Sequence, residues 1–96
     1  MREALQTLKK YVSMPSGSWD KEDTRALAEE IAADLAALSM GAKIIPGDRM
    51  GPVLEATYGH GPRQLMLMGH MDTVFPHDEC QPFRVEGNIA YGSGVS

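Results

Sequence analysis

The sequence lacks several features that would place a protein in a class at once. Its single cysteine, Cys80, cannot form a disulfide within the chain, which fits a reducing compartment and an ordinary loop position. No segment approaches the roughly 18 apolar residues that a membrane span requires. Residues 1–6 also lack the uninterrupted apolar stretch of a signal peptide. We therefore expect a cytoplasmic protein that does not enter a membrane.

Clustered basic residues are also missing. Nine Lys and Arg stand against thirteen Asp and Glu, giving a net charge of −4. The basic residues are scattered, with Lys9 and Lys10 as the one adjacent pair. A surface that binds nucleic-acid phosphates needs clustered Lys and Arg. The sequence therefore argues against a nucleic-acid partner.

The composition is that of an ordinary globular chain, with 43% hydrophobic and 23% charged residues. At 96 residues it holds one domain at most, and such a chain buries about 60 to 68% of its unfolded surface.

Leu5, Leu8 and Val12 are spaced by three and four residues, which predicts a short amphipathic helix. We expect this helix to end near the Pro-Ser-Gly-Ser break at residues 15–18.

A second helix is predicted from about residue 21 to residue 40. Asp20 is a typical N-cap, and Gly41 suits the left-handed position after a helix. Apolar residues recur behind Asp20 at helical spacing: Leu27, Ile31, Leu35 and Leu38. The acidic residues of this segment lie on other faces. We expect them to be solvated rather than to bind a metal.

Strand signals follow. Residues 43–45 and 53–58 carry β-branched and aromatic side chains on either side of a turn. After a second turn at residues 59–62, residues 65–69 form an apolar run without alternation, which is typical of a strand covered on both faces. We expect residues 65–69 to be the central strand and to pair in antiparallel fashion with residues 53–58.

Near the end of the sequence, residues 83–86 and 89–91 flank the Gly87-Asn88 pair, a two-residue hairpin signal. The whole pattern predicts an α/β protein with two helices packed on a partial mixed β-sheet.

His70 and Asp72 are the best candidates for chemistry. They follow the apolar run directly, and the carboxyl ends of strands are the usual place for binding sites in α/β sheets. Residues two apart in an extended segment share a side, so Asp72 can accept a hydrogen bond from the His70 imidazole and orient it toward a metal. The alternative is a His-Asp pair that only caps a loop. His60 and His77 lie in turn-like contexts and are not counted as ligands.

Other chemistries have little support. The glycine-rich residues 92–96 lack both phosphate-binding fingerprints and have no lysine after them. Ser16, Ser18 and Ser93 do not lie in a Gly-x-Ser-x-Gly elbow, which argues against a serine hydrolase.

Taken together, residues 67–76, 82–87 and 90–95 resemble the glutamate carboxypeptidase branch of the aminoacylase-type di-zinc metallopeptidases in both order and spacing. The resemblance implies that His70 is a zinc ligand. It also implies that Asp72 is the catalytic aspartate that supports this histidine. A complete member of the family binds two zinc ions and hydrolyses an amide bond.

The same resemblance places a metal-bridging aspartate directly after the position of Ser96, and the other ligands later still. We therefore expect residues 1–96 to be the amino-terminal portion of a metallopeptidase catalytic domain, without a separate second domain. The expected activity is zinc-dependent removal of a C-terminal amino acid such as glutamate from a peptide or N-acyl amino acid. We expect the 96-residue chain to be inactive alone. The alternative is a non-catalytic module that forms a homo-oligomer through exposed sheet edges.

Overall fold

The fold is known from a computed structural model, which describes residues 2–75 and 79–94. Along the chain the elements are α1 (Arg2–Val12), α2 (Lys21–Ala37), β1 (Gly41–Ile45), β2 (Val53–Thr57), β3 (Arg84–Glu86) and β4 (Ile89–Tyr91). Both predicted helices form, and the α/β class is confirmed. No helix within the described residues is long and apolar enough to cross a membrane.

Helix α2 begins where the sequence predicts and ends earlier. The Asp20 carboxylate accepts a hydrogen bond from the Asp23 backbone N–H at 3.1 Å, as an N-cap should. At the other end, Ser39 takes the left-handed position with a φ of 65°. Its N–H donates to the Ala36 carbonyl, and the Met40 N–H donates to that of Leu35, which together form a Schellman motif. Our assignment of the left-handed position to Gly41 was therefore wrong.

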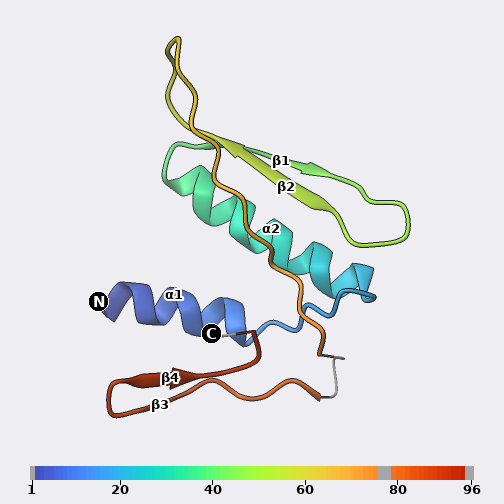
Figure 1. The fold of residues 1–96 in the computed structure, drawn as a ribbon, viewed down its shortest axis with the longest axis vertical. Coiled ribbons are helices and arrows are strands. Elements are labelled where there is room, and N and C mark those ends of the chain that lie inside the picture. Colours follow the sequence, from blue (N-terminus) through green and yellow to red (C-terminus); the bar gives the residue numbers. More distant parts are fainter. Residues whose placement is uncertain (1, 76–78, 95–96) are drawn as a thin grey trace.

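Strands β1 and β2 form an antiparallel pair whose register runs from Gly41↔Thr57 to Ile45↔Val53. This small sheet packs against α2 (Figure 1). The core is correspondingly small: Leu27 is 3% exposed and Ala28 is fully buried, both on α2. Thr24 is also buried there. The hydrophobic core of the described residues is therefore modest.

The predicted central strand does not form. Residues 65–69 belong to no strand, and the side chains of Leu65 to Met68 are 79–89% exposed. After β2 the chain forms a loop away from the sheet and then returns toward the end of α1 (Figure 1). A strand that is apolar on both sides requires a layer over each face, and the described residues supply no such pair of layers. The backbone therefore stays extended without strand pairing.

We also expected a single mixed sheet, and this expectation was wrong. The described residues form two separate two-stranded antiparallel sheets, β1-β2 and β3-β4. The β3-β4 hairpin was predicted correctly, and its turn places Gly87 at a φ of 61°. The parallel pairing in the described part of the chain is a single bridge, Gly17↔Thr73.

Helices α1 and α2 are held together by a polar cluster. The Lys10 ammonium lies 3.0 Å from the Glu30 carboxylate and 2.5 Å from Asp34 Oδ2, to which the Tyr11 hydroxyl also donates at 2.5 Å. Burial, followed by the hydrogen bond to Asp34, raises the pKa of Tyr11 to about 12. The hydrogen bonds from Lys10 and then Tyr11 lower the pKa of Asp34. Two acidic residues of α2 are thus helix-packing groups rather than merely solvated ones.

Candidate metal centre

The site is built where a loop near the start of the chain lies beside the segment that follows the apolar run. The Ser18 N–H donates to the Thr73 carbonyl at 2.8 Å, and the Thr73 N–H donates to the Ser16 carbonyl at 2.7 Å. Gly17 and Thr73 form the parallel bridge between these two hydrogen bonds. Residues 71–73 are therefore fixed in place although no full strand forms there.

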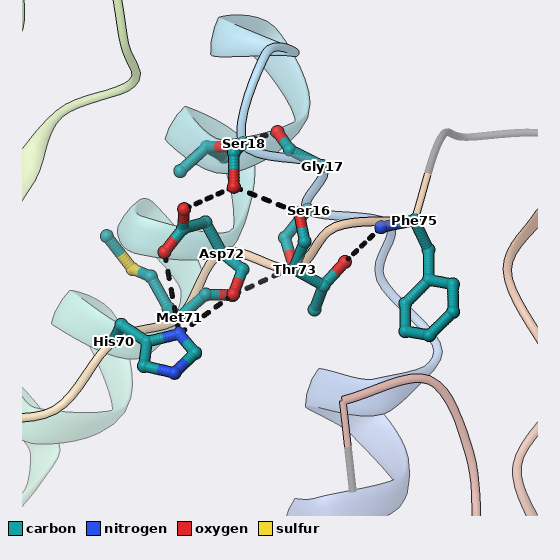
Figure 2. A network of polar contacts seen from close by, with 9 residues as sticks. Ser16, Gly17, Ser18, His70, Met71, Asp72, Thr73 and Phe75 are labelled. Atoms are coloured by element: carbon teal, nitrogen blue, oxygen red, sulfur yellow. Dashed lines mark hydrogen bonds and ion pairs between the residues drawn. The ribbon is translucent and has the colours of Figure 1, made fainter.

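Side-chain hydroxyls add to this backbone pairing. Ser16 is 4% exposed and donates to the Met71 carbonyl at 2.8 Å. The Ser18 hydroxyl lies 2.5 Å from Asp72 Oδ2 and 3.0 Å from the Thr73 carbonyl oxygen (Figure 2). These contacts bring residues that are 54 and 55 positions apart in the sequence into one hydrogen-bonded cluster.

The loop is attached to α2 as well. Thr24 is buried, and its hydroxyl lies 3.2 Å from the Gly17 carbonyl oxygen and 2.9 Å from that of Asp20. The start of the longest helix thus supports the loop that carries Ser16 and Ser18, and through it the segment that carries Asp72.

The orientation of His70 is the central geometric feature. Its Nδ1 atom lies 2.9 Å from the Asp72 backbone carbonyl oxygen and 3.5 Å from Asp72 Oδ1 (Figure 2). A carbonyl oxygen only accepts hydrogen bonds, so this contact requires the proton on Nδ1. The neutral ring then carries its lone pair on Nε2, which is the form that binds a metal. The His70 side chain is 84% exposed.

Asp72 takes part differently from what the sequence predicts. We expected its carboxylate to accept the histidine hydrogen bond, yet the nearer acceptor is its backbone carbonyl. The carboxylate instead lies between two groups, with Oδ2 toward Ser18 and Oδ1 toward His70 (Figure 2). Asp72 therefore orients the imidazole with the main chain and places a negative charge beside it.

Two open hollows meet at this point. One has a volume of about 670 Å³ and the other about 460 Å³. Five residues line both of them: Ser18, Ile31, His70, Met71 and Asp72. The larger hollow is also lined by apolar side chains of α1 and α2 and by Cys80. A ligand of moderate size can therefore reach the imidazole from either side.

The donor set fits one ligand of a zinc site. His70 offers an accessible neutral nitrogen, and its other ring nitrogen is held by a hydrogen bond, which is the usual arrangement around a metal-binding histidine. A catalytic zinc ion normally takes three protein ligands. Within the described residues no group of three or more His, Cys, Asp or Glu side chains could hold a metal ion. Of the ligands that such a site needs, the described residues offer one candidate, His70.

The other candidates take no part in this geometry. His60 lies in the exposed turn after β2, and His77 lies outside the described residues. Ser93 accepts a hydrogen bond from the Gln81 N–H at 2.7 Å. Sequence reasoning considered Ser16 and Ser18 only as nucleophiles and missed them as hydrogen-bond partners. Two hydroxyls two positions apart in a turn-forming break were the available signal, but their distant partners were not visible in it.

Comparison with known proteins supports the resemblance seen in the motifs. The chain is 35% identical over 100 residues to carboxypeptidase G2 of Pseudomonas sp. (strain RS-16), a match that covers 96% of this chain. The chain spans 23% of the length of that relative. No protein-family model matches the chain, and no solved structure matches it. The similarity to this relative therefore extends over nearly all of the 96 residues.

Proposed function

We propose that His70 is a zinc ligand in a zinc-dependent carboxypeptidase or deacylase, which hydrolyses the amide bond to a C-terminal amino acid such as glutamate. The observation that carries this proposal is the hydrogen bond from His70 Nδ1 to the Asp72 carbonyl at 2.9 Å, because it leaves Nε2 available beside two open hollows. The similarity to carboxypeptidase G2 supports the class of reaction.

In this proposal the residues of the chain have separate tasks. His70 binds the metal through Nε2, and Asp72 holds the ring so that Nε2 points outward. The carboxylate of Asp72 lies 3.5 Å from Nδ1 and places a negative charge beside the ring. Zinc, when bound, polarises the amide carbonyl and lowers the pKa of a bound water molecule. Two zinc ions are expected in the complete site, as in the family that the motifs resemble.

The 96-residue chain is inactive by itself in this account. One imidazole cannot hold a catalytic zinc ion, and the general base and the other ligands have no candidates in the described site. The natural substrate is a peptide or an N-acyl amino acid. Its side-chain preference is set by residues that the described site does not include.

A chimera tests the proposal. Residues 1–96 replace the matching segment of carboxypeptidase G2, and hydrolysis of an N-acylated glutamate is measured with zinc present. We expect the chimera to be active and His70→Ala to abolish activity. The Asp72→Ala variant should lose roughly 10- to 100-fold, which is typical for the partner of a metal-binding histidine. His60→Ala is the matched control and should leave the rate unchanged. Equal rates for the His70 and His60 variants would refute the role of His70.

A second candidate function rests on the exposed apolar run. Leu65, Met66, Leu67 and Met68 are 79–89% exposed, and contiguous exposed apolar residues are a common contact surface between chains. We propose self-association of the 96-residue chain through this run. Native mass measurement should then give a dimer that Leu67→Glu dissociates. Val74→Glu, at a position that is 87% exposed outside the run, is the control and should leave the dimer intact. A wild-type monomer would exclude this candidate.

A further inference from the structure

Ser18 contacts the Asp72 carboxylate, which lies beside the candidate metal ligand. Its hydroxyl is 2.5 Å from Asp72 Oδ2, while Oδ1 of the same group lies 3.5 Å from His70 Nδ1 (Figure 2). We propose that Ser18 is a positioning residue that fixes the Asp72 carboxylate against the His70 imidazole. This inference rests on the proposed function of His70, and it adds the loop near the start of the chain to the site.

The length of the contact favours this role. Hydroxyl groups that donate to an ionised carboxylate do so at about 2.5–2.7 Å, closer than the usual spacing between neutral groups. The Thr73 carbonyl oxygen, at 3.0 Å, is the other acceptor within reach of Ser18. A hydroxyl has one proton to donate. The shorter, charge-assisted contact therefore takes that proton, and Asp72 is the main partner of Ser18.

The Ser18 hydroxyl is not needed to hold the loop against the segment that carries Asp72. The loop is already joined to the segment by two backbone hydrogen bonds, from Ser18 to Thr73 and from Thr73 to Ser16. Neither of these involves the Ser18 side chain. Among the described residues, Ser18 is the side chain that donates to Asp72 Oδ2. Removal of its hydroxyl therefore leaves the loop paired and frees the carboxylate to rotate.

Ser16 is a matched control in the same loop. It carries the same hydroxyl and donates it to the same neighbouring segment, at 2.8 Å. Its acceptor is the backbone carbonyl of Met71 and not a side chain. Ser16→Ala and Ser18→Ala thus each remove a contact between loop and segment, but only the second reaches Asp72.

The test measures the side-chain conformation of Asp72 by NMR. Three-bond couplings to its Cγ report the χ1 rotamer populations in the isotope-labelled 96-residue chain. We expect one dominant rotamer in the wild type and in Ser16→Ala, and a mixture in which no staggered rotamer exceeds about half in Ser18→Ala. Ser18→Thr should retain the single rotamer and Ser18→Val should lose it. The Thr and Val variants have the same shape, so a folding defect in the alanine variant does not obscure the result.

A single Asp72 rotamer in both Ser18→Ala and Ser18→Val would overturn the inference. Added zinc then separates it from the proposed function, measured in the chimera with carboxypeptidase G2 because one imidazole alone cannot hold a catalytic zinc ion. In the chimera we expect zinc to shift the Nε2 signal of His70 and not that of His60, with weaker binding in Ser18→Ala. If the Asp72 rotamer depends on Ser18 but zinc leaves His70 unchanged, the positioning of Asp72 holds and the metal role of His70 fails. If zinc binds His70 with equal strength in wild type and Ser18→Ala, Ser18 has no role in the metal site.

Discussion

Leu27 should carry more of the stability of this chain than any exposed leucine. It is 3% exposed on α2 and belongs to a core in which Ala28 is the other buried hydrophobic residue of the described chain. Replacement by alanine removes three carbon atoms, and each buried CH₂ group contributes about 0.8 kcal/mol. The transfer contribution is therefore roughly 2.4 kcal/mol. Leucine-to-alanine changes in protein cores cost about 2–5 kcal/mol once the cavity is included.

The surroundings of Leu27 place the expected cost of Leu27→Ala near the lower end of the range of about 2–5 kcal/mol. It lines the hollow of about 670 Å³, which is open to solvent, so neighbouring groups and water can occupy the space that the side chain leaves. We expect Leu27→Ala to lower the free energy of unfolding by about 2–3 kcal/mol, measured by urea denaturation followed by circular dichroism. Leu38→Ala is the control, because Leu38 is 66% exposed, and it should cost less than about 0.5 kcal/mol. Equal losses for the two variants would refute the assignment of the core.

Two further predictions concern pH and backbone packing. Because the folded state raises the pKa of Tyr11 from 10.0 to about 12, the stability it contributes is complete below pH 10 and is lost as the pH rises toward 12. The alkaline limb of a stability–pH curve should therefore flatten in Tyr11→Phe, and an unchanged limb would contradict this. A β-carbon at Gly51 would lie 2.7 Å from Thr24 Cβ, so Gly51→Ala should destabilise the fold by about 1–3 kcal/mol in urea denaturation. Gly69→Ala, where a β-carbon has no neighbour within 4 Å, is its control, and equal costs would count against the packing of the loop on α2.

The parts of the fold that depend on neighbouring residues were predictable from the sequence. The N-cap at Asp20 and the turn at Gly87 act over a few residues, and both form as expected. The end of α2 was less predictable because Ser39 takes the left-handed position that glycine usually fills. Whether residues 65–69 form a strand depends on layers that cover both faces of the run. The local sequence does not show whether those layers are present.

In the site, too, the features that depend on neighbouring residues were predictable and those that depend on distant residues were not. The spacing of His70 and Asp72 predicted that they share a side, and the structure places Nδ1 within 3.5 Å of the carboxylate. That the main-chain carbonyl of Asp72 is the nearer acceptor depends on backbone geometry, which the spacing leaves open. Ser18 is 54 residues away from Asp72, and without the folded chain no pattern in the sequence connects them.

The central claim is that His70 binds zinc through Nε2 while Asp72 holds Nδ1. Nitrogen NMR of the ¹⁵N-labelled chain tests it most directly, because the two ring nitrogens give separate signals. Before zinc is added, the His70 ring should carry a proton on Nδ1 and none on Nε2. In the chimera with carboxypeptidase G2, added zinc should then shift Nε2 of His70 and leave His60 unaffected. A His70 ring that carries its proton on Nε2, or that responds to zinc no more than His60, would contradict the account.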